Sequence, residues 1–220
     1  MSCIIDVEEE RDVAVIDIPN AFIKTRVEDE NDTVFINIRG FLVDILVEID
    51  PDVYKLHVTT DKKGVKQLLV QCQNALYGTM VASLLYYRKF TKSLTDVGFK
   101  INLYNPCVTG KMIYGQHMTI CYHVDECKLI HRRIKVNDHM IKWLIQEYET
   151  IFKEGSGKMT VSRGKVHKYL VMTLDYTVCG QVHIKMIYFL EEVLMDLDKA
   201  EPKGGGTNTS AAPDNLFKVA

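Results

Sequence analysis

The 220-residue sequence lacks a strong net charge, paired metal-binding cysteines and a long apolar run. Its formal charge of −2 gives no overall basic signature for nucleic acid, which counts against a self-sufficient polymerase with basic grooves. Six cysteines occur without a CxxC pair, which favours free thiols in a reducing compartment over a zinc site. Neither a leader-like apolar segment nor a run of membrane-spanning length is present. We therefore expect an intracellular protein, cytoplasmic or nuclear, that is neither secreted nor membrane-bound.

What is present is typical of a globular domain. A hydrophobic content of 47% with 25% charged residues is enough to form a core and argues against a generally disordered chain. Basic residues gather locally in two clusters. One contains Arg88, Lys89 and Lys92, and the other contains Arg132, Arg133 and Lys135. Each cluster is either a solvated face or a lining for nucleic acid, and the sequence leaves both open.

Hydrophobic periodicity predicts an α+β fold. Strands are predicted at 12–18, 33–38, 66–71, 168–176 and 181–186, with a hairpin of arms 106–113 and 118–124 that continues back through 128–131. Helices are predicted at 75–97, 137–152 and 187–197, and residues around 50–64 are predicted to form a loop. We interpret residues 1–200 as one domain and 201–220 as a flexible linker.

From residue 12 the core elements follow the order β, α, β, β, α, β. This is the split βαβ order of ferredoxin-like folds, in which two helices cover one face of an antiparallel sheet and a C-terminal β-hairpin and short helix are added here. In this topology the first strand neighbours the central hairpin.

Two acidic elements end predicted strands: VIDIPNAF at 15–22 with Asp17, and HVDEC at 123–127 with Asp125 and Glu126. The predicted topology brings them to one sheet edge. Acidic residues at strand ends are often only turn formers. Adjacent carboxylates repel each other, however, so a bound cation is a natural reason to hold them together. Paired carboxylates that bind divalent metal are the minimum requirement for a nucleotidyl-transfer site.

Five segments in order carry a resemblance to a known family: DIPNAFI (17–23), NALYG (74–78), DVGFKINLYNPCV (96–108), CYHVDECKLIH (121–131) and GKMTVSRGKVHKYLVMTLDY (157–176). With them, the chain resembles the reverse transcriptase domain of copia-type retrotransposon polyproteins. The resemblance implies a polymerase palm that uses two Mg²⁺ ions, with Mn²⁺ as a substitute, for RNA- or DNA-templated DNA synthesis. The implied partners are a template–primer and deoxynucleoside triphosphates.

The resemblance also assigns roles to residues. Asp17 and Asp125 match metal-binding aspartates, and Ile18 would lend a backbone carbonyl. Phe22 matches an aromatic that stacks under the incoming sugar and disfavours a ribose 2′-hydroxyl, although Phe22 taken alone reads as a core residue. His123 stands where Tyr is common and is expected to pack beside the primer end.

The chain departs from the family pattern at three positions. Glu126 replaces a second Asp, and its extra methylene displaces the carboxylate by ~1.5 Å, for which we expect a rate loss on the order of 10²-fold. Val81 replaces a Gln that contacts the nucleotide, and valine cannot make that hydrogen bond. Val171 stands where Gly is common. Because the family's basic fingers segment begins upstream, we expect a palm-centred fragment, with weak or absent synthesis by this chain alone.

Two other classes stay open. A non-catalytic ferredoxin-like binding module, or a relic of an element, would carry the same acidic loops, although no RNA-recognition string such as K/R-G-F-x-F occurs. A metal-dependent cyclase or phosphatase would also use Asp17 and Asp125, but GxGxxG and GK[ST] are both absent. The oligomeric state is left undetermined.

Overall fold

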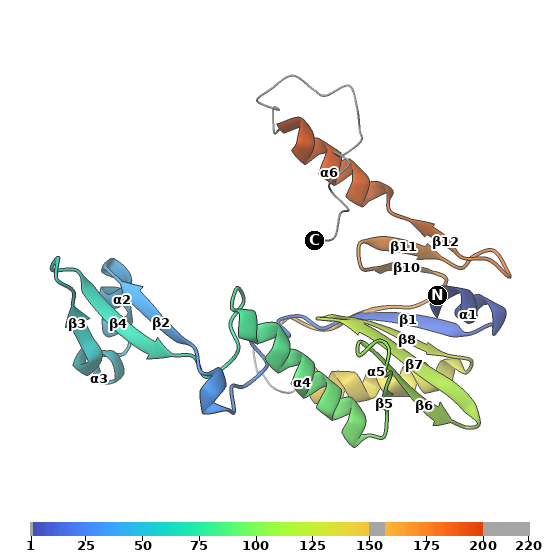
Figure 1. Ribbon diagram of the computed structural model, residues 1–220, viewed down its shortest axis with the longest axis horizontal. Coiled ribbons are helices and arrows are strands. Elements are labelled where there is room, and N and C mark those ends of the chain that lie inside the picture. The colour runs from blue at the N-terminus through green and yellow to red at the C-terminus, as the bar shows by residue number, and fades with distance from the viewer. Residues whose placement is uncertain (1, 150–156, 200–220) are drawn as a thin grey trace, which may run out of the picture.

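The computed structural model describes residues 2–149 and 157–199, which form an α+β fold with antiparallel sheets (Figure 1). Its centre is a six-stranded sheet in the spatial order β5-β6-β7-β8-β1-β9. The bounds of these strands are β1 Asp12–Asp17, β5 Lys100–Ile101, β6 Val108–Ile113, β7 Gln116–His123, β8 Glu126–His131 and β9 Thr160–Ser162. The predicted tail 201–220 lies outside the described residues.

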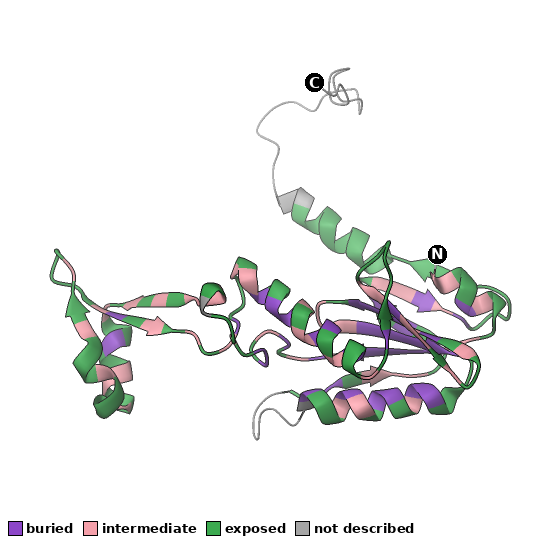
Figure 2. Ribbon diagram, turned by 60° about the horizontal axis from the view of Figure 1, so that its bottom comes forward, coloured by how far each residue is buried: buried purple, intermediate pink, exposed green. Residues whose placement is uncertain are grey.

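Helices α4 (Met80–Asp96) and α5 (Ile134–Glu149) cover one face of this sheet. Strand β1 (DVAVID) is buried on both faces, and Ala14 and Ile16 point toward the helices. Across from them, Phe90 of α4 and Leu144 and Tyr148 of α5 complete the main core. Figure 2 shows the buried residues gathered on the sheet and along the inward sides of both helices.

The opposite face of the sheet is covered by α1 (Ser2–Glu8) and by a three-stranded sheet of β10 (Val166–Tyr169), β11 (Met172–Asp175) and β12 (His183–Lys185). Val13, Val15 and Ile130 of the central sheet pack here against Tyr169 and Leu174. Helix α6 (Ile187–Lys199) follows β12, and its residues 187–196 are exposed. Within the described residues, no helix is long and apolar enough to cross a membrane.

A small lobe is inserted between β1 and α4 and projects from the body of the molecule (Figure 1). It contains a sheet in the order β2-β4-β3 with two helices. Its elements are β2 Phe35–Arg39, α2 Phe41–Ile49, α3 Pro51–Tyr54, β3 Val58–Thr60 and β4 Lys66–Gln71, with 3-10 turns at Glu30–Asp32 and Lys55–His57. The predicted strands near 33–38 and 66–71 are present as β2 and β4.

The prediction of a loop over 50–64 is wrong, because this segment contains α3 and β3. The Asp50 side chain caps α3 by accepting a hydrogen bond from the Val53 backbone N–H at 3.2 Å, and Pro51 starts the helix. The proline and acidic residues that suggested a loop therefore start a helix. Helix α2 was not predicted, although Asp44 and Glu48 stand four residues apart, which places them on one side of a helix.

The prediction of one continuous strand over 168–176 is also wrong, because a two-residue turn divides this segment into β10 and β11. Leu170 and Val171 form the turn with φ values of 48° and 59°, in the left-handed region. The strand that pairs with β1 at the sheet edge is instead β9, Thr160–Ser162, which was not predicted. Helix α4 starts at Met80, later than predicted, since Gly78 has a φ of 87°. Helix α5 starts earlier than predicted, at Ile134.

Candidate active site

The three acidic residues meet at one end of the central strands. Asp17 is the last residue of β1 and lies directly opposite Glu126, the first residue of β8. Residues directly opposite in an antiparallel pair have Cβ atoms about 5 Å apart on the same face of the sheet. His123, the last residue of β7, lies opposite Glu126 in turn. The structure thus forms a cross-strand row of His123, Glu126 and Asp17.

Asp125 reaches this row from the turn between β7 and β8. The turn consists of Val124 and Asp125, and Val124 has a φ of 51°, which is unfavourable for a β-branched residue. The backbone carbonyl of Asp125 accepts a hydrogen bond from the Ile18 N–H at 2.9 Å. This bond ties the strained turn to the residue after Asp17 and so fixes the acidic tip beside the end of β1.

The pKa of Asp17 is affected by the nearby charge of Asp125. Partial burial, and then the negative charge of Asp125, raise the pKa of the Asp17 carboxyl above its ordinary value. Two carboxylates that repel each other in this way favour a proton or a cation between them. Beneath them Cys127 is fully buried, and burial with the charges of Asp125 and Asp17 raises the pKa of its thiol, which keeps it neutral.

Glu126 already has a bonding partner. Its Oε2 accepts a hydrogen bond from the Leu170 N–H at 2.7 Å, in the turn between β10 and β11. One carboxylate oxygen therefore connects the central sheet to the sheet that covers it. Within the described part of the chain, no group of three or more His, Cys, Asp or Glu side chains is arranged to hold a metal ion. The predicted metal role of Asp17, Asp125 and Glu126 stays a prediction.

An aromatic cluster adjoins the acidic residues. The half-buried Phe22 ring has its centroid 4.7 Å from that of Tyr77 and 6.1 Å from that of Tyr86. Burial and the charges of Asp125 and Asp17 raise the pKa of Tyr77, while a hydrogen bond with the Phe22 backbone opposes the shift.

Tyr77 therefore lies within the electrostatic reach of both aspartates, yet the sequence analysis gave it no role. The available signal was its place in the NALYG segment, directly before Gly78.

Ile18 and Val81 are placed by apolar packing. The Ile18 side chain is fully buried in the main core. Val81, in the first turn of α4, packs with Phe22 against a small cluster of Ala75, Ala82 and Leu85. Val81 and Phe22 thus share one apolar cluster.

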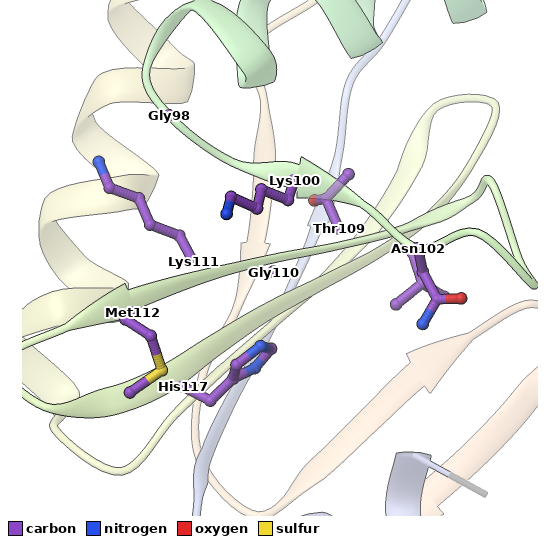
Figure 3. A pocket seen from close by; sticks show the side chains of 9 residues that line it. Gly98, Lys100, Asn102, Thr109, Gly110, Lys111, Met112 and His117 are labelled. Atoms are coloured by element: carbon purple, nitrogen blue, oxygen red, sulfur yellow. The ribbon is translucent and has the colours of Figure 1, made fainter.

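A separate hollow of about 510 Å³ lies at the β5–β6 edge of the sheet (Figure 3). It is lined in part by Lys100, Lys111 and His117, which would attract an anion. Lys111 Nζ, however, donates to the Val97 carbonyl at 2.6 Å, at the end of α4. The His117 ring lies so close to Gly110 that a Cβ there would approach it to 2.4 Å. These side chains stabilise the sheet edge, and His117 lies about 20 Å along β7 from His123.

No family model and no curated protein match this sequence. Among solved structures, the chain is similar to apo telomerase from Candida tropicalis, with 11% identity and a TM-score of 0.42 over 84% of this chain and 35% of that one. It is also similar to telomerase from Candida albicans in complex with a TWJ fragment of telomeric RNA, with 8% identity and a TM-score of 0.41 over 84% of this chain and 33% of that one. The chain spans about a third of the length of these telomerase chains. Similarity of this degree is distant and assigns neither a family nor an activity.

Proposed function

We propose that the chain is the palm of a reverse-transcriptase-like polymerase of copia type, which adds deoxynucleotides to a primer 3′ end. The observation that carries the proposal is the meeting of Asp17 and Asp125, joined through the Ile18–Asp125 backbone hydrogen bond. The strand order β9-β1-β8-β7, with α4 and α5 on one face, supports a ferredoxin-like palm as the scaffold. The proposed partners are template–primer and deoxynucleoside triphosphates, in an intracellular setting.

The proposed ion is Mg²⁺, which binds carboxylate oxygens such as those of Asp17 and Asp125. This ion is commonly bound by one or two carboxylates, with water and substrate phosphates completing an octahedron, so a third protein carboxylate is not required. Asp17 and Asp125 would hold it, with the Ile18 carbonyl adjacent. When bound, Mg²⁺ or Mn²⁺ would stabilise negative charge at the primer oxygen and at the pyrophosphate leaving group. Phe22, supported by Tyr77 and Val81, would provide the floor under the sugar.

In this proposal Glu126 serves two roles. Its charge belongs to the acidic row, while its Oε2 holds the Leu170 turn. A carboxylate oriented by the turn is displaced from the position that a shorter aspartate would take. Shortening the side chain would free it from Leu170 and move it toward Asp17, at the cost of one charge-assisted hydrogen bond of about 2 kcal/mol.

Primer extension on a homopolymer template with Mg²⁺ or Mn²⁺ tests the proposal. We expect slow deoxynucleotide incorporation that is abolished by Asp125→Asn and increased by about 10²-fold in Glu126→Asp. Glu126→Gln is the matched control, because it keeps an acceptor for the Leu170 N–H but removes the charge. Incorporation that survives Asp125→Asn would contradict the proposal.

A second candidate, a non-catalytic ferredoxin-like binding module, is favoured by the hydrogen bond between the Leu170 N–H and Glu126, which gives this carboxylate a structural role that needs no metal. It predicts no incorporation by the wild-type chain or by Glu126→Asp when both are folded, as judged by circular dichroism. Incorporation by Glu126→Asp therefore distinguishes the two candidate functions.

A further inference from the structure

The two basic clusters of the sequence have different surroundings. In the cluster on α4, Arg88 pairs with Asp32 at 3.0 Å and Lys92 pairs with Asp96 at 2.8 Å. Lys89 donates to a backbone carbonyl at 2.8 Å. The two terminal cations of this cluster are thus already neutralised by carboxylates.

The second cluster lies between β8 and α5 and is not neutralised in this way. Within residues 2–149 and 157–199, Arg132, Arg133 and Lys135 form no ion pair with a carboxylate. The first turn of α5 also contains no acidic residue, so the positive end of its dipole adds to these charges. Asp138, further along α5, is bound to Arg163 at 3.1 Å.

These cations line a pocket. Its volume is about 720 Å³, and its inner wall is formed by apolar side chains of β6, β7 and α5. The aliphatic members are Ile113, Met118, Ile134, Val136 and Met140. At the rim stands Tyr114, which is 74% exposed, with the Arg133 guanidinium 5.2 Å from one face of its ring. At this exposure, much of the ring surface is accessible to a planar ligand.

We propose that this basic pocket, defined by Tyr114, Arg132, Arg133 and Lys135, binds single-stranded nucleic acid at a site separate from the acidic row. Unpaired cations beside an exposed aromatic ring are the combination that holds a phosphate backbone and stacks a base. An acidic protein segment would satisfy the cations, but it would leave the exposed ring of Tyr114 without a stacking partner. The pocket lies at the far end of β8 from Glu126, about 17 Å away along the strand.

The choice of nucleic acid over other anions rests on the proposed function, whereas the pocket itself does not depend on catalysis. Binding here would retain a strand while its end is processed elsewhere. Because the cluster is exposed, its side chains can be replaced with little effect on folding.

The test is fluorescence anisotropy with a labelled single-stranded oligonucleotide of about 12 nucleotides, within the usual site size, over a series of salt concentrations. In the variant Arg132→Ala/Lys135→Ala, loss of two phosphate contacts should reduce the slope of log K against log salt by about 1.4. The control Arg88→Ala/Lys92→Ala removes the same charge from the paired cluster and should keep the wild-type slope. Tyr114→Ala should weaken binding about tenfold through loss of one base stack.

Equal slopes for wild type and Arg132→Ala/Lys135→Ala would overturn the proposal, as would equal losses in both double variants. A polyglutamate peptide that competes as strongly as the oligonucleotide, with no effect of Tyr114→Ala, would instead assign the pocket to an acidic protein segment. The anisotropy measurement needs no nucleotide incorporation. A failure of the pocket therefore appears as an unchanged slope, whereas a failure of the proposed catalytic function appears only in the primer-extension test.

Discussion

At the scale of single residues, the structure keeps two β-branched side chains in left-handed backbone conformations, at Val124 and Val171. Both occupy two-residue turns, where Asn and Gly are the favoured residues. Val124 precedes Asp125, and Val171 follows Leu170, whose N–H binds Glu126. The β-branched residues with left-handed backbone thus lie in the two turns that border the acidic row, and such strain is common at functional sites.

Val171→Gly should stabilise the protein. Val171 is 65% exposed, so little packing is lost, and removing its Cβ relieves about 1–2 kcal/mol of left-handed strain. The added flexibility of the unfolded chain offsets about half of this gain, which leaves a net increase of about 1 kcal/mol in the free energy of unfolding by urea. Val178→Gly, at an exposed position without a positive φ, is the control and should lower stability. A loss of stability in Val171→Gly would mean that the turn is not strained.

Asp17→Asn tests how far the charge of Asp17 destabilises the folded protein. Because the folded state raises the pKa of Asp17, its contribution to stability is fully present below the unfolded pKa of about 3.9 and is lost as pH rises through the folded pKa. Without divalent metal, the variant should therefore melt at a higher temperature than wild type at pH 7, with no gain near pH 3.

Asp175→Asn is the matched control for this measurement. Hydrogen bonds from the Thr177 side chain and backbone lower the pKa of Asp175, so its contribution is present above the unfolded pKa and is lost as pH falls through the folded pKa. This variant should lose stability at neutral pH. If Asp17→Asn also melts lower than wild type at pH 7, repulsion between Asp17 and Asp125 does not govern the site.

At the scale of elements, α1 is fixed to the sheet by a buried ion pair. Asp6 Oδ2 lies 2.5 Å from Lys128 Nζ, with side-chain exposures of 1% and 0%. Lys128 also donates to the Cys3 sulfur at 3.2 Å, and Tyr176 donates to Asp6 at 3.3 Å. This network joins α1, β8 and the end of β11 in the second core, so α1 helps to hold the covering sheet in place.

Breaking this pair from one side should be costly. Asp6→Ala leaves the Lys128 ammonium buried without its partner, and we expect a loss of about 3–5 kcal/mol in the free energy of unfolding. Asp6→Leu/Lys128→Met removes both charges and should come close to wild type. Lys92→Ala, at an exposed pair, should lower the stability far less than Asp6→Ala does. An Asp6→Ala variant as stable as wild type would show that α1 is not held by this pair.

The way in which each element is stabilised decides whether it could be predicted from the sequence. Helices α4 and α5 and strands β1, β7 and β8 have strong apolar periodicity, because each packs on the main core, and they were predicted with shifted ends. The short strand β9 has only three residues and is defined by its pairing with β1, which no local pattern records. The division at Leu170–Val171 was missed because neither residue has the turn chemistry that the backbone adopts.

The same reasoning explains which contacts of the acidic row could be predicted from the sequence. Asp17, Asp125 and Glu126 were predicted to meet because strand order could be inferred. The register places Asp17 opposite Glu126, and the Ile18–Asp125 backbone hydrogen bond holds the Asp125 turn beside the end of β1. Their roles stay a prediction. The bond from Leu170 to Glu126 depends on a sheet that packs from above, and the approach of Tyr77 depends on the loop before α4. Both are tertiary contacts between distant segments, which sequence patterns alone do not specify.

At the scale of the whole molecule, the central sheet separates two cores, and the acidic row lies where the sheet, the aromatic cluster and the covering sheet meet. A ligand bound there contacts several layers at once and stabilises the fold as a unit. The proposed metal binding can therefore be tested by thermal stability, independent of any catalytic activity.

We expect Mn²⁺ or Mg²⁺ to raise the melting temperature of the chain. A ligand that binds only the folded state at one hundred times its dissociation constant adds about 2.7 kcal/mol to stability. The increase should disappear in Asp17→Asn/Asp125→Asn, which starts from a higher metal-free melting temperature because the partly buried charge of Asp17 and its repulsion by Asp125 are both removed. Asp44→Asn, at an exposed carboxylate of the lobe paired with Lys66, controls for surface binding and should keep the increase. An equal rise in all three proteins would assign the metal to the surface and would leave the acidic row without a cation-binding role.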